Sequence, residues 1–532
     1  MSISAAGTEH GGRTDGVAGL SVSSPPGRWV IAVTVLGSGI AALDATVVNI
    51  ALPSIGREFH TGIAAVQWVM TGYTLTLAAF LLIGGSLGDR FGRRRVYSIG
   101  IVWFAVASAA CGLAPSALVL IAGRMLQGIG AALLTPGSLA ILEASFAPAD
   151  QSRAIGAWSG LSGVATAAGP LIGGYLITAT SWRWIFFINV PVSALVVALA
   201  ARHVPESRAP RADGHLDFAG ALATVVFLAG VTFAFIQAPT AGWASPVVIA
   251  MVAAGITGLI ALLLRERAAA SPMLPLRMFK ARQFAAANAV TFIVYAALTG
   301  AIFLLPVTLQ VVDGYSPLAS GAATLPMTVI MLTLSAQSGK LAARIGPRLQ
   351  MSVGPVVMAA GLALLTLAGR GSSYPVHVLP GIAVFGLGTT IMVAPLTSTV
   401  MNSVPAAQAG IASAVNNDMS RFGGLLAIAV LPAIAGITGA AYLHPAALAA
   451  GFRTAMVIAA AVCAGGGLLA AVTIVNPVRP RRTPAAGPSR QYRHCALDAA
   501  PLTAPCQGEA SPTGHPDRAM RGNPGPRSGW GK

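Results

Sequence analysis

Apolar stretches of about twenty residues recur along most of the chain, separated by short polar connections. As an α-helix rising about 1.5 Å per residue, each is long enough to cross the roughly 30 Å hydrocarbon core of a bilayer. Only helices and closed barrels satisfy their backbone polar groups there, so we expect an all-α integral membrane protein. We place fourteen helices at residues 29–51, 66–88, 96–114, 117–138, 154–178, 184–201, 218–238, 246–264, 285–310, 319–342, 350–369, 376–400, 410–437 and 453–475.

The composition agrees with this assignment. Charged residues make up 9% of the 532 residues and hydrophobic ones 55%, whereas a soluble domain has about 25% charged residues. The net charge of +17 would suit nucleic acid, but the 33 basic residues lie in short clusters between apolar stretches. That distribution favours the lipid bilayer as the partner and argues against nucleic acid. The four cysteines stand singly, so we predict neither a metal site nor a cofactor.

The basic residues also test the helix count. With the N-terminus inside the cell, fourteen helices put 27 lysines and arginines on the inner side and four on the outer side, namely Arg57, Arg183, Arg370 and Arg453. Inner loops of membrane proteins carry such an excess. We therefore expect a multi-pass plasma-membrane protein with both termini in the cytoplasm. The preference for arginine over lysine suggests a bacterial source.

An internal repeat divides the chain. The segment GSLGDRFGRR at 85–94 reappears as GKLAARIGPR at 339–348, each after the second helix of a six-helix block, although Asp89 becomes Ala343. We therefore expect two related halves with an inserted helix pair between them. The predicted parts are a disordered N-terminus (1–28), a first bundle (29–201), a linker with two accessory helices (202–282), a second bundle (283–476) and a disordered basic tail (477–532).

Four motifs follow one another on successive helices. LDATVVNIALP lies at 43–53, GSLGDRFGRRR at 85–95, RMLQGIGAA at 124–132 and GPLIGG at 169–174. Together they resemble the motifs of the fourteen-helix drug:proton antiporters of the major facilitator superfamily, and the resemblance covers about residues 29–475. It implies the major facilitator fold, two six-helix bundles plus two inserted central helices. It further implies export of an amphiphilic small molecule against protons, with no enzymatic activity and no cofactor beyond the proton gradient.

The loop after the second helix carries glycines that suit a tight turn and arginines that suit the inner membrane surface. The resemblance implies that it acts as a conformational gating loop between the halves. Its proposed residues are Gly85, Asp89, Arg90, Gly92, Arg93 and Arg94. The alternative is a loop that only fixes topology, which explains the arginines but not Asp89 or the glycines.

The fifth helix carries a small-residue stripe, which allows close helix packing. The resemblance implies that this stripe lies at the interface between the halves. Its residues include Gly156, Gly169, Pro170, Gly173 and Gly174. The alternative is generic helix packing.

Charged residues within the spans mark a candidate site, because a charge in mid-bilayer costs about 3 kcal/mol unless it is partnered. Asp44 and Arg124 lie about 22 Å and about 10 Å from opposite membrane faces, so their depths overlap and they can pair. We assign them to proton or substrate coupling, with a fixed structural ion pair as the alternative. Asp418 and Arg421, three residues apart on one helix, can neutralise each other and form a second candidate.

Other polar residues within the spans are candidates for lining a cavity: Asn49, Gln67, Tyr73, Gln127, Tyr295, Gln310, Asn416 and Asn417. Asn49 and Pro53 are interpreted as the outer end of the first helix. The predicted function is proton-coupled export of drugs or antibiotics by a monomer, which confers resistance. The alternative is a narrower exporter or permease for a metabolite such as an amino acid, a siderophore or a self-made antibiotic. No loop is long enough for a soluble catalytic or sensing domain.

Overall fold

The computed structural model describes residues 19–208, 217–268, 276–369, 371–405 and 408–476. Within them the secondary structure is helical, apart from an isolated parallel bridge between Leu20 and Phe146. All of the described residues fall within one compact unit. The predicted tail, most of the predicted N-terminal segment and Arg370 lie outside the described residues.

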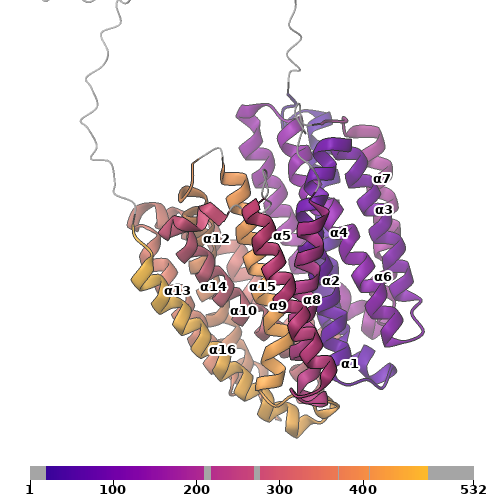
Figure 1. Cartoon of the computed structure of the whole chain (residues 1–532), viewed down its shortest axis with the longest axis vertical. Helices are drawn as coiled ribbons and strands as arrows, with labels where there is room; N and C mark the ends of the chain where they lie inside the picture. The colour runs from indigo at the N-terminus through magenta and orange to yellow at the C-terminus, as the bar shows by residue number, and fades with distance from the viewer. Residues whose placement is uncertain (1–18, 209–216, 269–275, 370, 406–407, 477–532) are drawn as a thin grey trace, which may run out of the picture. The chain divides into compact units, whose positions relative to one another are not determined.

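The order of the helices follows the predicted plan (Figure 1). The first block contains α1 (Pro25–Glu58), α2 (Ile63–Phe91), α3 (Arg93–Gly112), α4 (Ala117–Ser145), α5 (Pro148–Ala179), α6 (Trp184–Phe187) and α7 (Asn189–His203). The inserted pair is α8 (Phe218–Ala241) and α9 (Pro246–Ala268). The second block contains η1 (Leu276–Lys280), α10 (Arg282–Val311), α11 (Pro317–Ala323), α12 (Leu325–Ile345), α13 (Pro347–Leu365), η2 (Tyr374–Val378), α14 (Leu379–Asn402), α15 (Ala409–Ile434), η4 (Ala441–Leu443) and α16 (Pro445–Thr473).

Each of the fourteen predicted spans coincides with a helix or with a short helix that runs into a longer one. Among the described residues, 13 of these are long and apolar enough to cross a membrane. The remaining one is α15, which has 26 residues. It carries two asparagines, Asp418 and Arg421 in its first half, and these lower its hydropathy.

Helix α1 is longer than predicted. It starts after Ser24, whose side chain accepts a hydrogen bond from the Gly27 amide, and it runs through Pro53 to Glu58. The interpretation of Asn49 and Pro53 as its outer end is therefore wrong. Proline is tolerated inside a membrane helix where a neighbouring helix satisfies the freed backbone.

The two blocks share a turn between their second and third helices. Gly92 joins α2 to α3 with φ of 110°, and Gly346 joins α12 to α13 with φ of 86°, both in a region that favours glycine. The backbone amide of Arg94 donates to Glu206, and that of Arg348 donates to Asn476, each acceptor following the last helix of its block. The repeat at 85–94 and 339–348 therefore corresponds to a repeated structure.

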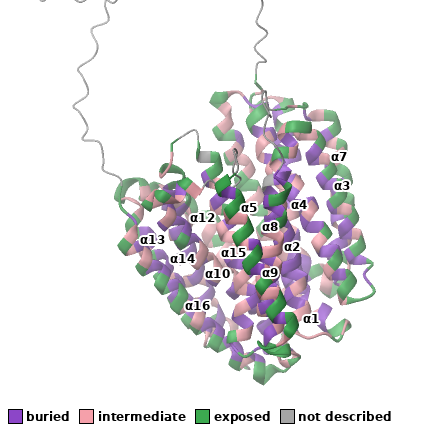
Figure 2. Cartoon of the chain, viewed as in Figure 1, coloured by how far each residue is buried: buried purple, intermediate pink, exposed green. Residues whose placement is uncertain are grey.

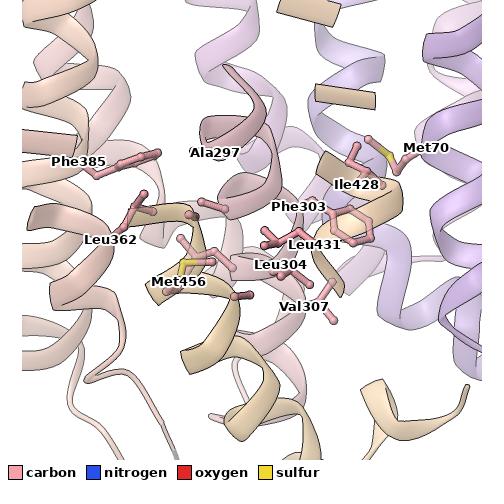
Figure 3. Close-up of a cluster of buried hydrophobic side chains, with 14 of the residues drawn as sticks. Met70, Ala297, Phe303, Leu304, Val307, Leu362, Phe385, Ile428, Leu431 and Met456 are labelled. Atoms are coloured by element: carbon pink, nitrogen blue, oxygen red, sulfur yellow. The ribbon is translucent and has the colours of Figure 1, made fainter. Parts of the chain in front are cut away.

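Contacts between the blocks gather at the end of the bundle where α1 and α10 finish, here called the Glu58 end. The Ile63 amide donates to the Gly439 carbonyl at 2.9 Å, and the Tyr442 hydroxyl donates to the Thr61 carbonyl at 3.0 Å. Burial raises the pKa of Tyr442 to about 12, so this hydroxyl remains a donor across the physiological range. Buried side chains from both blocks also meet in one apolar cluster, in which Met70 of α2 lies near Ile428 of α15 (Figure 3).

The two blocks meet along two lateral interfaces, α2 with α15 and α5 with α12, here called seams. The inserted pair covers the first of them. Helix α8 packs between α2 and α15, where Leu75, Ala78, Leu228 and Leu425 form a buried cluster. Helix α9 packs on α8, and exposed residues run along its outer side (Figure 2). The α2–α15 seam is therefore sealed by apolar contacts from a third helix.

At the other seam, formed by α5 and α12, most side chains of both helices remain at least partly exposed, and we call it the open seam. In α12 only Ser338 is buried, and in α5 the buried residues are Ala154, Gly169, Gly173 and Gly174. Large apolar side chains on both helices are about half exposed, among them Val164 and Val329. The two seams therefore differ in what covers them.

Candidate functional site

Asp44 of α1 and Arg124 of α4 form an ion pair inside the first block. The Arg124 Nη1 lies 2.5 Å from the Asp44 Oδ2, and neither side chain has any exposed surface. This is the pairing that the estimated depths of the two residues allowed. A buried pair of this kind is costly to form but far more costly to leave half-complete, because one charge would then lack a partner.

Amide side chains complete the shell around the carboxylate. Gln127 donates from Nε2 to the Asp44 Oδ1 at 2.9 Å and accepts from the Arg124 Nη1 at 2.6 Å. Asn189 of α7 donates to the same Oδ1 at 3.2 Å and to Ser108 of α3 at 3.0 Å. Four helices thus contribute side chains to one buried network. Gln127 was predicted as a cavity residue, whereas Asn189 and Ser108 were not predicted.

Arg124 is held by backbone and aromatic rings as well. Its Nε donates to the Val69 carbonyl at 3.1 Å, and its guanidinium carbon lies 4.3 Å from the Tyr73 ring centre and 5.8 Å from that of Phe186. Such ring faces attract cations. The Nη2 atom nevertheless has no hydrogen-bond partner, although it is buried. The site therefore retains one donor group, the Arg124 Nη2, that has no hydrogen-bond partner among the described residues.

The second candidate pair is not formed. Asp418 and Arg421 make no ion pair in the described part of the chain, and the buried atoms Asp418 Oδ1 and Arg421 Nε have no hydrogen-bond partner. The two groups do not form the salt bridge that their spacing allows. Residues three apart leave a helix about 60° apart, and here Asp418 is buried while Arg421 is only half-buried. Both groups are left with unused hydrogen-bonding capacity.

The remaining predicted cavity residues have different surroundings. Asn416 of α15 donates to Asn288 at 3.2 Å and to Thr291 at 2.7 Å on α10, so it links two helices of the second block. Asn417 is exposed and donates to the Ser413 carbonyl of its own helix. Tyr295 is half-buried against the apolar core.

Asn49 is buried with its Oδ1 unpartnered. Gln67 and Gln310 are also buried, and each donates to a backbone carbonyl of the opposite block. The two glutamines are interface residues rather than free cavity-lining groups.

The predicted glycine stripe of α5 divides into two parts. A Cβ added to Gly169, Gly173 or Gly174 would lie 2.0–2.6 Å from atoms of α1 or α11, so these positions require glycine. The Pro170 carbonyl likewise lies 2.3 Å from a Cβ added to Gly321 of α11. At Gly156 an added Cβ would have no neighbour within 4 Å, so close packing does not explain this residue. Gly160, one turn further along α5, likewise has no neighbour within 4 Å of an added Cβ.

The predicted gating loop is bonded within the first block. Arg93 forms an ion pair with Asp89 at 2.9 Å and donates to the Ala140 carbonyl of α4 at 3.1 Å. Arg94 lies 3.6 Å from Glu206. Within the described residues, none of these bonds reaches the second block. The predicted latch between the halves is therefore not formed in this conformation.

The other predicted loop residues have weaker contacts. A Cβ added to Gly85 would make only ordinary contact with Pro136, at 3.6 Å, and Arg90 lies over the ring of its neighbour Phe91 at 5.6 Å. Of the loop glycines, Gly92 therefore carries the conformational requirement.

Known proteins resemble the chain in sequence and in fold. The sequence model of the Major Facilitator Superfamily matches residues 34–428. The chain is 36% identical over 413 residues to the multidrug resistance protein Stp of Mycobacterium tuberculosis (strain CDC 1551 / Oshkosh), an alignment that covers 77% of this chain and 76% of Stp. It is also 36% identical over 431 residues to the tetracenomycin C resistance and export protein of Streptomyces glaucescens, covering 80% and 79% of the two chains.

The fold likeness extends to solved structures. A bacterial homolog of the human lysosomal transporter Spinster, in an inward-facing and occupied conformation, matches with a TM-score of 0.61 at 17% identity, covering 86% of this chain and 100% of that one. With the motifs in order on a shared fold and relatives above 30% identity, the chain belongs to the major facilitator superfamily, alongside members named for drug and antibiotic resistance.

Proposed function

We propose that this protein exports amphiphilic drugs or antibiotics from the cell by antiport with protons. The observation that carries the proposal is the buried Asp44–Arg124 pair, with its amide shell and the unused Arg124 Nη2. Buried charges within a membrane bundle are expensive and are usually retained for function. The names of the relatives support a drug or antibiotic as the substrate.

Asp44 is the proposed coupling group. Its carboxylate is held by Arg124, Gln127 and Asn189, so protonation would weaken three bonds at once. A change in the charge of Asp44 would therefore alter how α1, α4 and α7 pack together. Each proton that enters across about 100 mV supplies roughly 2.3 kcal/mol, enough for about a fifty-fold gradient of a neutral drug.

The predicted topology gives the two ends of the bundle a direction. With both termini in the cytoplasm, the Glu58 end faces outward, so the conformation described here is closed to the outside. The open α5–α12 seam then provides a route by which a membrane-dissolved substrate reaches the bundle from the inner leaflet. The half-exposed apolar residues along α5 and α12 support an amphiphilic substrate.

The test is gradient-driven efflux in inverted membrane vesicles that contain the full chain. An imposed pH gradient should drive accumulation of a lipophilic cationic dye, and Asp44→Asn should abolish it. Asp217→Asn is the matched control, because it removes another buried carboxylate that pairs with an arginine, 3.1 Å from Arg265, in the accessory helices. We expect this control to transport normally.

Two results would contradict parts of the proposal. Gradient-driven transport that survives Asp44→Asn would overturn the coupling role and leave the fixed structural ion pair as the explanation. Failure of the native chain to move any amphiphile, in vesicles that hold a pH gradient, would favour the narrower metabolite exporter.

A further inference from the structure

Two prolines leave backbone carbonyls without their normal donors at the Glu58 end. Pro53 lies inside α1 and Pro432 lies inside α15. Proline has no N–H, so the carbonyl four residues earlier loses its helical partner, and the ring distorts the adjacent turn. For Pro432 the freed carbonyl belongs to Ile428. Each block therefore has at least one such weak point, and Pro170 of α5 and Pro306 of α10 also lie inside helices.

Gln67 of α2 satisfies the weak point in the second block. Its Nε2 donates to the Ile428 carbonyl at 2.6 Å and to the Ala429 carbonyl at 3.2 Å. The side chain is 2% exposed. Both bonds cross from the first block to the second, and the shorter one ends on the carbonyl that Pro432 freed.

Gln310 of α10 makes the converse contact. Its Nε2 donates to the Ile50 carbonyl of α1 at 3.0 Å, three residues before Pro53. Its own Oε1 is buried without a partner, as is the Oδ1 of nearby Asn49. This contact is therefore less completely satisfied than that of Gln67, and we expect it to be the weaker of the two.

We propose that Gln67 and Gln310 are the two latches that hold the Glu58 end closed, each by donating from one block to a proline-weakened helix of the other. This inference rests on the proposed alternating-access transport, since only a transporter must open that end. Separation of the blocks there breaks both contacts and leaves the Ile428 carbonyl without a donor. At Pro432 the proline thus provides an acceptor that a side chain of the other block can engage and release, and at Pro53 the engaged carbonyl, that of Ile50, lies in the turn that the proline distorts.

Spin-label distances test the latches without requiring transport. Leu113 and Leu367 are exposed, follow α3 and α13 at the Glu58 end, and belong to different blocks. With both changed to cysteine in a chain whose native cysteines are replaced by alanine, their distance distribution reports the closed and open populations in lipid nanodiscs. We expect Gln67→Leu to lower the closed-to-open ratio about tenfold and Gln310→Leu about threefold.

A glutamine that acts within one block is the matched control. Gln350 of α13 is buried and donates from Nε2 to the Ser338 carbonyl and hydroxyl, both at 3.1 Å, in the same block. Gln350→Leu removes a comparable contact and should leave the distance distribution unchanged. Gln67→Met, which keeps the length of the side chain but has no hydrogen-bond donor, should reproduce the shift if Gln67→Leu does not fold.

A double-mutant cycle tests the role of the proline directly. Pro432→Ala restores an N–H that can bond the Ile428 carbonyl within α15, so Gln67 should matter less in that background. We expect the tenfold effect of Gln67→Leu to fall below about threefold. An unchanged effect in the Pro432→Ala background, or an equal shift from Gln350→Leu, would overturn the proposal. The spin-label distances report closure of the Glu58 end even if no dye is transported. A negative result for the latches can therefore be distinguished from a negative result for the proposed function.

Discussion

In the first block the Asp44 carboxylate has three side-chain partners, one of them a buried arginine, whereas in the second block the Asp418 Oδ1 and the Arg421 Nε have none. The backbones around them follow the same plan, down to the glycine turn after the second helix of each block. The repeat therefore provides a common scaffold, and the side chains give the two blocks different tasks. The first block holds the Asp44 carboxylate with both oxygens bonded, while in the second block the Asp418 Oδ1 and the Arg421 Nε have no hydrogen-bond partner.

Removal of Arg124 should expose this difference most strongly. Arg124→Met leaves the Asp44 charge buried without its cation, so we expect the free energy of unfolding to fall by about 3–5 kcal/mol. Arg421→Met, at a guanidinium with no ion pair among the described residues, should change it by less than about 1 kcal/mol. Unfolding midpoints in detergent micelles would measure both.

Addition of Asp44→Asn to Arg124→Met gives the internal control, because it removes the stranded charge and should recover part of the loss. Equal losses for Arg124→Met and Arg421→Met would show that both blocks hold their arginines alike, and the contrast would fail.

At the glycine turn that the two blocks share, we expect equivalent substitutions to reduce stability by the same amount in each block. Gly92→Ala and Gly346→Ala each force a Cβ into a backbone region that costs about 1–2 kcal/mol, and both Cβ atoms would crowd a polar side chain. We expect similar losses of stability in the two variants, measured by thermal unfolding. Gly88→Ala, where an added Cβ has its nearest neighbour at 3.9 Å, is the control and should be neutral. A large difference in stability loss between Gly92→Ala and Gly346→Ala would show that the two turns are not equivalent.

In the second block we expect removal of a buried carboxylate to maintain or raise stability rather than lower it. Asp418→Asn removes a buried carboxylate whose Oδ1 has no hydrogen-bond partner, so we expect stability to stay constant or to rise by up to about 1 kcal/mol. Asp44→Asn should lower it, because that carboxylate is fully bonded. Chemical denaturation of the two variants under identical conditions measures the difference. Equal destabilisation would mean that Asp418 has partners in solution comparable to those of Asp44.

Sequence patterns predicted the helices well because hydrophobic length is a local property. The spans, their order and the repeat all follow from it, and the Asp44–Arg124 pairing follows from depth along two antiparallel helices. Pro53 led to a wrong prediction of where α1 ends. The rule that proline ends a helix assumes that no other group compensates for the backbone carbonyl that the proline leaves without a donor. In this protein α1 continues through Pro53, and a glutamine from the other block donates to the Ile50 carbonyl, next to the Asn49 carbonyl that Pro53 frees.

The other features that the sequence did not predict depend on the direction of a side chain or on a partner that is distant in sequence. Asn189 lies alone in an apolar run, and its sequence neighbours do not indicate that α1 and α3 place Asp44 and Ser108 beside it. Asp418 and Arg421 have the right spacing to pair, but spacing fixes only the angle between side chains and not which of them is buried. Gln67 and Gln310 likewise meet backbone carbonyls in the other block, 361 and 260 residues away in sequence.

The loop after α2 supplies the smallest expected effect on stability. The Asp89 side chain is 43% exposed in its pair with Arg93, and such surface pairs contribute little, so Asp89→Asn should change stability by less than about 0.5 kcal/mol. If Asp89 instead engages the second block when the Glu58 end opens, the same variant should raise the closed-to-open ratio in the Leu113–Leu367 distance measurement.

Ala343→Asp places an acid at the equivalent position of the second block, where Pro347 stands in place of Arg93 and offers no cation. That variant should leave the distance distribution unchanged, because the second loop lacks both members of the pair. A shift from Ala343→Asp as large as that from Asp89→Asn would mean that any acid near this turn acts by charge alone, and the asymmetry between the two blocks would not extend to their loops.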